Sequence, residues 1–144
     1  MNDIKLDIDH KEDNRFYISP STIPKAGFGL FAKKTIEKGE KLYVFGIRIK
    51  LNSDLNICTG YARNYKFADP EDENYCIMPV SYAGMINQDP QNFNATIKND
   101  GKNVYFEFIR DIIENEEIFT YYGDGWCNVD NKVMAFIRSK ILAN

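Results

Sequence analysis

Residues 116–123 read EEIFTYYG, a short apolar segment that closes with two tyrosines and a glycine. Aromatic and β-branched residues favour strands, and glycine favours the turn that follows a strand. The pattern therefore predicts the end of a buried strand. A buried tyrosine hydroxyl needs a hydrogen-bond partner, however, so Tyr121 and Tyr122 are also candidates for the lining of a cleft.

Five segments before it have the composition or the alternating apolar pattern of short strands. Turn-forming residues separate them, and the sequence NDGK at residues 99–102 predicts a hairpin between the last two. The five segments are FYISPS (16–21), KLYVFGIRI (41–49), YCIMPV (75–80), NATIKN (94–99) and VYFEFIRDI (104–112). The arrangement predicts a mainly β protein.

Two helices are expected besides the strands. A short one falls at about residues 55–64, and a second begins after Asp130, a residue that favours the N-cap position. Apolar residues recur at helical spacing after Asp130, so one face of this C-terminal helix would pack on the sheets. The predicted organisation is an N-terminal extension over residues 1–15 and a single domain over residues 16–144.

Composition and charge narrow the functional classes. The chain has 144 residues, enough for one domain, and its net charge of −3 argues against general nucleic-acid binding. His10, the only histidine, lies in a polar stretch, which argues against a histidine base or a histidine-containing metal site. The three cysteines show no CxxC spacing, so we expect neither zinc nor a disulfide framework. Because no apolar signal or membrane segment is evident, we expect a cytoplasmic protein.

Two further motifs have both a structural and a functional interpretation. Ala26-Gly27-Phe28-Gly29 is usually a tight turn, and it lacks the third glycine and the following helix of a dinucleotide site. Asn87-Gln88-Asp89-Pro90 is usually a turn held by a side-chain hydrogen bond. Neither motif indicates a function alone.

Taken in order along the chain, these motifs resemble the SET domain of protein-lysine methyltransferases. IPKAGFGLFA at residues 23–32, followed by IEKGE at 36–40, is similar to the opening of that domain. YAGMINQ at 82–88, with Asn94-Ala95 shortly after, looks like the family's asparagine-histidine segment and its later asparagine. IRDI at 109–112, with EEIFTYYG after it, is similar to the closing motif. The resemblance covers residues 16 to about 126.

The resemblance implies several small twisted sheets around a C-terminal pseudoknot, in which the closing segment threads a loop containing Asn87. It also implies methyl transfer from S-adenosylmethionine to a protein lysine, with Tyr122 as the catalytic tyrosine. The residues implied in cofactor binding are Ala26, Gly27, Phe28, Gly29, Tyr65, Asn87, Gln88 and Trp126. Those implied in the substrate channel are Val44, Ile97, Thr120 and Tyr121.

The chain departs from the family pattern at several positions. Gln88 replaces the usual histidine, Val44 stands where many members carry a tyrosine, and Tyr121 stands where an aspartate is common. No cysteine-rich tail closes the channel, so the C-terminal helix would form that wall. A second interpretation is therefore a catalytically inactive SET-like domain that serves as a protein-binding module. An unrelated all-β interaction domain is the third.

The expected partner is a protein or peptide that presents a lysine, with a histone tail as one candidate. We expect no direct contact with nucleic acid or membrane. The nucleus, including that of a host cell, is the alternative location to the cytoplasm. Trp126 has an alternative role as an anchor of the final helix.

Overall fold

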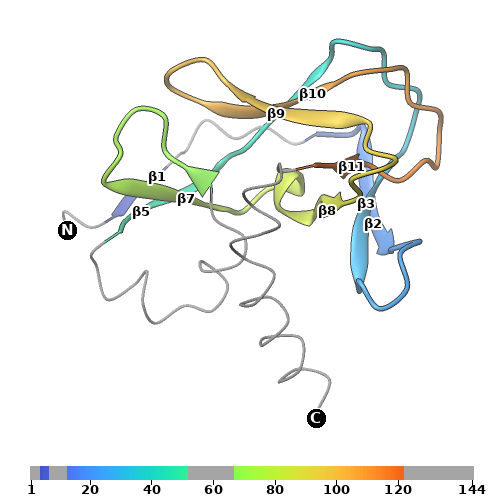
Figure 1. Ribbon diagram of the computed structural model, residues 1–144, viewed down its shortest axis with the longest axis horizontal. Coiled ribbons are helices and arrows are strands. Elements are labelled where there is room, and N and C mark those ends of the chain that lie inside the picture. The colour runs from blue at the N-terminus through green and yellow to red at the C-terminus, as the bar shows by residue number, and fades with distance from the viewer. Residues whose placement is uncertain (1–3, 7–12, 52–66, 122–144) are drawn as a thin grey trace.

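A computed structural model of the chain describes residues 4–6, 13–51 and 67–121 (Figure 1). These residues form eleven strands and one 3-10 helix. The elements are β1 (Ile4–Leu6), β2 (Phe16–Pro20), β3 (Phe28–Ala32), β4 (Lys41–Tyr43), β5 (Gly46–Lys50), β6 (Phe67–Ala68), β7 (Tyr75–Pro79), η1 (Tyr82–Met85), β8 (Asn87–Gln88), β9 (Ala95–Asn99), β10 (Val104–Phe108) and β11 (Phe119–Thr120). No helix in this part of the chain is long and apolar enough to cross a membrane.

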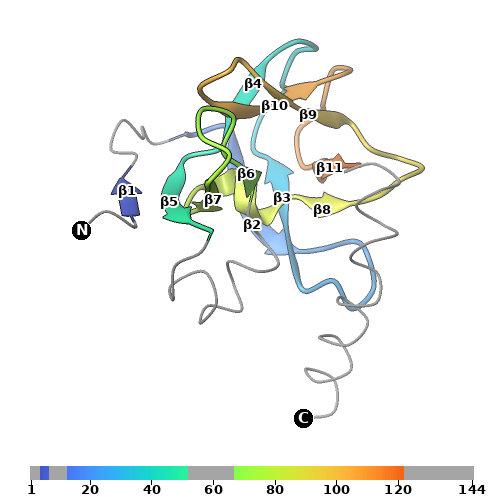
Figure 2. The ribbon, with the colours of Figure 1, turned by 60° about the vertical axis from the view of Figure 1, so that its left-hand side comes forward.

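The strands form four small sheets rather than one large sheet (Figures 1 and 2). One sheet has the order β1-β5-β7-β6, a second has the order β4-β10-β9, and β2-β3 and β8-β11 are two-stranded pairs. Every pair is antiparallel except β8 and β11, which run parallel. Antiparallel neighbours need only short turns, which suits a chain with turn-forming residues between most of its strands. The predicted mainly β fold of several small sheets is confirmed.

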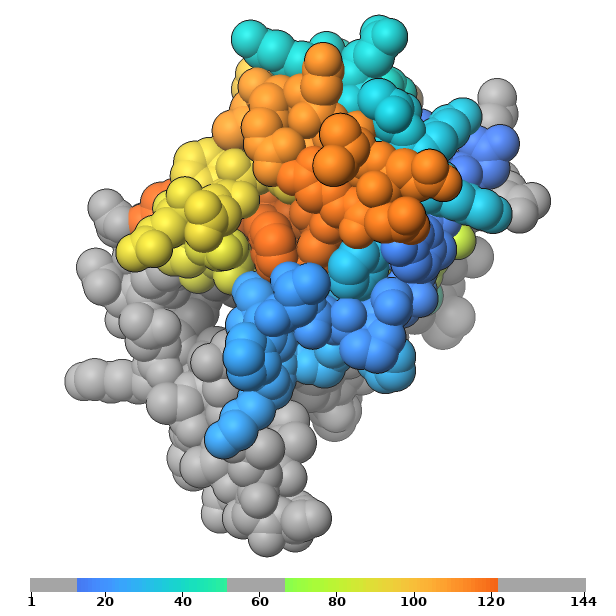
Figure 3. Space-filling view, turned by 90° about the vertical axis from the view of Figure 1, so that its right-hand side faces the viewer, coloured from blue at the N-terminus to red at the C-terminus, as the bar shows by residue number. Residues whose placement is uncertain are grey.

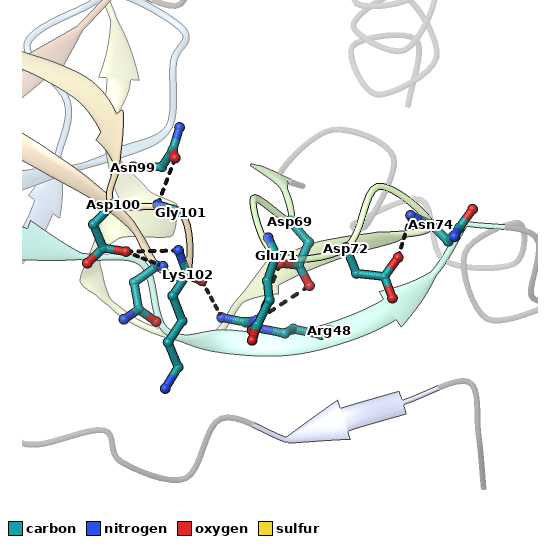
Figure 4. A network of polar contacts seen from close by, with 10 residues as sticks. Arg48, Asp69, Glu71, Asp72, Asn74, Asn99, Asp100, Gly101 and Lys102 are labelled. Carbon is teal, nitrogen blue, oxygen red and sulfur yellow. Dashed lines mark hydrogen bonds and ion pairs between the residues drawn. The ribbon is translucent and has the colours of Figure 1, made fainter.

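The β9–β10 hairpin confirms the turn predicted at residues 99–102. The Asp100 carboxylate accepts hydrogen bonds from the backbone N–H groups of Lys102 at 3.0 Å and Asn103 at 2.7 Å (Figure 4). Gly101 has a φ of 90°, in the left-handed region that favours glycine. These two features fix the register of β9 against β10.

One apolar core joins the sheets. Residues of β10 alternate between buried and half-buried, so that Val104, Phe106 and Phe108 face inward. The Phe16 ring of β2 stacks on that of Phe108, with 6.0 Å between the ring centroids. Full burial of such a side chain contributes about 1.5–3 kcal/mol, and a two-stranded sheet is marginal alone. The shared core is therefore what makes the small sheets stable.

The structure differs from the sequence pattern in two strands. The pattern predicts one strand over residues 41–49, but the chain turns between β4 and β5, which belong to different sheets. A Cβ on Gly46 would lie 2.7 Å from the carbonyl carbon of Met78, so only glycine lets β5 begin this close to β7. The glycines of residues 26–29 predict a turn, whereas residues 28–32 form β3. The two predicted helices lie outside the described residues.

A polar network ties the four-stranded sheet to the β9–β10 hairpin (Figure 4). Arg48 of β5 donates to the Asp69 carboxylate at 3.3 Å and to the Glu71 carboxylate at 3.0 Å. Its second terminal nitrogen donates to the carbonyl of Lys102 at 3.0 Å. One guanidinium thus links a strand, the loop after β6 and the hairpin turn.

Candidate active site

The closing segment pairs with a strand that lies far from it in the sequence. β11 runs parallel to β8, with Phe119 opposite Asn87 and Thr120 opposite Gln88 (Figure 2). The backbone N–H of Asp89 also donates to the carbonyl of Thr120 at 2.9 Å. The asparagine motif and the closing motif therefore lie side by side.

Asn94 holds the other edge of the closing segment. It is fully buried, its Nδ2 donates to the carbonyl of Glu117 at 2.9 Å, and its Oδ1 accepts from the backbone N–H of Phe119 at 2.9 Å. Its own backbone N–H donates to the carbonyl of Phe119 at 3.0 Å. The closing segment thus runs between residues 87–89 and Asn94, the two arms of one loop. This arrangement agrees with the threading that the family resemblance implies.

The first half of the glycine motif forms an exposed turn. Residues 21–27 connect β2 to β3, with Lys25 and Gly27 at φ values of 66° and 78°. A Cβ on Gly27 would meet none of the described residues within 4 Å, so none of them blocks a ligand from the backbone here. Phe28, the next residue, is 59% exposed, which is unusual for a large aromatic side chain.

Gly29 is required for a different reason. A Cβ there would lie 3.0 Å from Cδ of Glu117, closer still to Oε2, and 3.2 Å from Nδ2 of Asn87. The same Asn87 Nδ2 donates to the carbonyl of Phe28 at 3.0 Å. The glycine motif, the asparagine motif and the closing segment therefore meet at one point. In Figure 3 the orange-red surface of the last described residues lies between the yellow and the blue surfaces.

Glu117, which the sequence reasoning did not single out, is the charged group at this junction. Its carboxylate accepts from the hydroxyl of Ser21 at 2.8 Å, and from the N–H and the hydroxyl of Thr22, both at 2.7 Å. Buried carboxylates are rare unless they are hydrogen-bonded. The one sequence signal that could have pointed to it is a charged residue directly before an apolar run.

The neighbouring Glu116 has a different environment. Arg110 forms a hydrogen-bonded ion pair with the Glu116 carboxylate, and the N–H of Ile113 donates to it at 3.2 Å. Partial burial acts to raise the pKa of Glu116, but these hydrogen bonds outweigh burial and hold the pKa below its usual range. Adjacent glutamates are thus stabilised by a cation in one case and by neutral donors in the other.

The four predicted channel residues occupy two settings. Val44 is buried and Ile97 partly buried against the shared core, on the inner face of the β4-β10-β9 sheet. The Tyr121 ring lies 5.9 Å from that of Phe93. Thr120 is fully buried, and its hydroxyl has no hydrogen-bond partner among the described residues. Such a hydroxyl is costly in a core, so Thr120 is suited to contact a bound polar group.

The remaining predicted residues are only partly covered by the structure. Ala26 lies in the turn, where its N–H donates to the carbonyl of Ile23 at 3.2 Å, and Gln88 is half-buried in β8. Tyr65, Tyr122 and Trp126 lie outside the described residues, so their roles stay predictions. Within residues 4–6, 13–51 and 67–121, no group of three or more His, Cys, Asp and Glu side chains is placed to hold a metal ion.

Comparison with known proteins agrees with this geometry. The SET domain profile matches residues 27–123, which is more than half of the chain. The chain belongs to the SET-domain family. By sequence, no curated protein matches it.

Solved structures of histone methyltransferases are similar to the chain. Against Chaetomium thermophilum Polycomb Repressive Complex 2 bound to S-adenosylmethionine, the identity is 25% and the TM-score 0.64, over 85% of this chain and 17% of that chain. A Plasmodium falciparum protein described as a histone methyltransferase is 22% identical with a TM-score of 0.58, over 80% of this chain and 98% of that chain. The methyltransferase domain of human PR domain-containing protein 2 is 19% identical with a TM-score of 0.58, over 78% and 80% of the two chains. The last two show likeness in fold alone, and the chain spans less than a fifth of the Polycomb chain.

Proposed function

We propose that the chain is a protein-lysine methyltransferase that uses S-adenosylmethionine. The observation that carries the proposal is the meeting of the glycine motif at residues 26–29, Asn87 and the closing segment at one junction. These are the three motifs to which the family resemblance assigns roles in cofactor binding and catalysis. Membership in the SET-domain family supports the same activity.

The described residues fit a cofactor of this kind. None of the described residues fills the space beside the Gly27 backbone, and the exposed Phe28 ring offers a ligand an apolar surface. Asn87 uses its Nδ2 within the protein, and its Oδ1 accepts no hydrogen bond within the described part of the chain. That oxygen can accept from the ammonium of an amino-acid ligand. The Thr120 hydroxyl is a further polar group without a partner among these residues.

S-adenosylmethionine, when bound, supplies a methyl group on a sulfonium. The task of the chain is to present a neutral lysine amine in line with that methyl group. A free lysine has a pKa of about 10.4, so deprotonation at pH 7 costs about 4–5 kcal/mol. An apolar channel lowers this pKa because it disfavours the ammonium form, and no histidine base is then needed. Tyr122 is the proposed residue whose hydroxyl orients the amine.

The proposed substrate is a protein or peptide that presents a lysine. A histone tail is the first candidate, because one similar Chaetomium thermophilum structure is a complex with trimethylated histone H3. Labelled methyl transfer to histones and to a total cell lysate tests this choice. Transfer to lysate proteins without transfer to histones would leave the enzyme class intact and replace the substrate.

A second function, protein binding without catalysis, is favoured by Gln88 and Val44. Val44 is buried in the shared core and carries no hydroxyl, at a position where the family resemblance expects a tyrosine in many members. S-adenosylmethionine binding without transfer to any histone or lysate protein would support this second function over the first.

Tyr122→Phe tests the catalytic assignment. We expect turnover to fall about 100-fold, because a slightly misplaced nucleophile loses about that factor, while cofactor affinity stays nearly unchanged. Labelled transfer measures the first quantity and calorimetry the second. Tyr105→Phe, in β10 beside Lys41, is the matched control and should leave both unchanged. Full turnover in Tyr122→Phe would contradict the assignment.

A further inference from the structure

Glu117 is buried and pairs with no cation within the described part of the chain. The residue is 4% exposed, and none of the ion pairs among the described residues includes it. A buried carboxylate is unfavourable unless hydrogen bonds replace its hydration. Neutral donors supply those bonds here.

The donors come from two separate elements. Oε1 accepts from the N–H and the hydroxyl of Thr22, both at 2.7 Å. Oε2 accepts from the hydroxyl of Ser21 at 2.8 Å and from Nδ2 of Asn87 at 3.4 Å. An ionised carboxylate has about four lone-pair sites, so its capacity is filled. One side chain therefore joins the glycine turn to β8.

The backbone on both sides of Glu117 also contacts β3. Phe31 and Glu117 form an antiparallel bridge, and the N–H of Ile118 donates to the carbonyl of Leu30 at 2.8 Å. This contact places Gly29 so close to the Glu117 carboxylate that a Cβ at residue 29 would not fit. Gly29 and Glu117 are thus complementary in shape, and a change at one affects the other.

We propose that Glu117 is a positioning residue for methyl-donor binding. Its carboxylate holds the open turn around Gly27 and the amide of Asn87 in the relative placement that the donor requires. The inference rests on the proposed function. Since all four lone-pair sites of the carboxylate are occupied by protein donors, Glu117 acts through Ser21, Thr22 and Asn87 rather than on the donor itself.

Glu117→Gln separates these links because the amide keeps the shape but donates at one end. An NH2 group in the place of Oε1 would set two donors against each other, because the backbone N–H of Thr22 points at this position and cannot rotate. The NH2 group therefore takes the place of Oε2, where the Ser21 hydroxyl can rotate to accept. Asn87 Nδ2 cannot do so while it also donates to Phe28, and the variant loses that link.

The test compares Glu117→Gln with Glu116→Gln, a change at the adjacent residue, whose carboxylate pairs with Arg110 rather than with Ser21 and Thr22. We expect Glu117→Gln to weaken S-adenosylmethionine binding about tenfold in calorimetry, as the loss of a hydrogen bond to a charged group does. The KM for the donor should rise by a similar factor, while the KM for a lysine peptide stays unchanged. Glu116→Gln should leave donor binding unchanged. Wild-type donor affinity in Glu117→Gln, or an equal rise of both KM values, would overturn the proposal.

A double-mutant cycle adds a test of the shape match. Gly29→Ala alone places a Cβ against Oε2 and should weaken donor binding about tenfold or more. In a Glu117→Ala background the carboxylate is gone, and the same Gly29→Ala change should cost much less. Two losses that simply multiply would show that the residues act independently.

Hydrogen exchange at the Thr22 amide distinguishes this inference from the proposed function, since it needs no ligand. We expect faster exchange in Glu117→Ala and nearly wild-type exchange in Glu117→Gln, which keeps the Thr22 acceptor. Absence of donor binding in the wild type would end the proposed function without changing this readout. Wild-type exchange in Glu117→Ala would show that Glu117 does not hold the turn.

Discussion

Two buried carboxylates in this domain are stabilised in opposite ways. Asp69 is 5% exposed and pairs with the Arg48 guanidinium, which also contacts Glu71 and the carbonyl of Lys102 (Figure 4). Glu117 is 4% exposed, and its partners among the described residues are hydroxyl and amide donors. Within this part of the chain, a cation balances the charge of the first carboxylate, whereas neutral donors surround the second.

This difference suggests different roles: the contacts of Asp69 stabilise the fold, and those of Glu117 arrange the proposed site. The Arg48–Asp69 ion pair lies within the four-stranded sheet, and removal of Asp69 leaves the mostly buried Arg48 with the exposed Glu71 as its counter-charge among the described residues. Glu117 instead organises polar groups beside an open turn, and each of its bonds can be altered singly. We therefore expect changes around Asp69 to alter stability alone, and changes around Glu117 to alter stability and donor binding together.

The largest expected effect on stability is that of Asp69→Ala. The change leaves the mostly buried Arg48 without its buried partner, so the free energy of unfolding should fall by about 3 kcal/mol. Urea unfolding measures the loss, and calorimetry with S-adenosylmethionine should show no change in donor affinity. Weaker donor binding at a temperature where the variant is fully folded would break the comparison.

A smaller effect is expected from Thr22→Val on the Glu117 side. The variant loses the hydrogen bond from the hydroxyl to Oε1 of Glu117 but keeps the one from the backbone N–H. The free energy of unfolding should therefore fall by about 1 kcal/mol. Donor affinity should fall as well, in contrast to Asp69→Ala. Thr22→Ser, which keeps the hydroxyl, is the control and should restore both quantities.

Acid should weaken the ion pair of Glu116 with Arg110. The pKa of Glu116 is lowered in the folded state, so its contribution to stability is present above the unfolded value and is lost as pH falls through the lowered value. The melting temperature should therefore drop below about pH 4, the region in which an unperturbed glutamate titrates. In Arg110→Gln this acid-dependent part of the drop should shrink, and an unchanged pH profile would contradict the role of Arg110.

The smallest effect is expected from Glu71→Ala. Glu71 contacts the same guanidinium as Asp69, but its side chain is 55% exposed. Exposed pairs contribute little, so the free energy of unfolding should change by no more than about 0.5–1 kcal/mol. If urea unfolding shows that Glu71→Ala loses as much free energy of unfolding as Asp69→Ala, burial does not determine how much each carboxylate contributes to stability.

The sequence predicted the features that depend on local chemistry. The NDGK hairpin and the alternation of β10 follow from turn preference and from the two-residue period of a strand. The break between β4 and β5 does not, because it depends on how closely Gly46 approaches Met78 from another strand. The resemblance to the SET domain implied that Asn87 would lie beside the closing segment, which the β8–β11 pair confirms.

Glu117 shows why the rest of the site was not predicted. Its donors at residues 21, 22 and 87 are 96, 95 and 30 positions away, and no local pattern links them. For the same reason the sequence did not show why residue 29 must be glycine: the Glu117 carboxylate fills the position that a Cβ would take. Sequence motifs mark where segments meet, whereas the group that joins them becomes visible only in three dimensions.

The closing segment between Asn94 and residues 87–89 also sets an order of folding. The loop cannot take its final form until residues 116–120 have left the ribosome, because they lie between its two arms. Contacts between residues so far apart in sequence form slowly, and the unpaired β8 edge is exposed meanwhile. Completed insertion then protects the junction, since the segment cannot leave without breaking hydrogen bonds on both edges at once. We expect this part of the chain to be the last to fold and among the slowest to open.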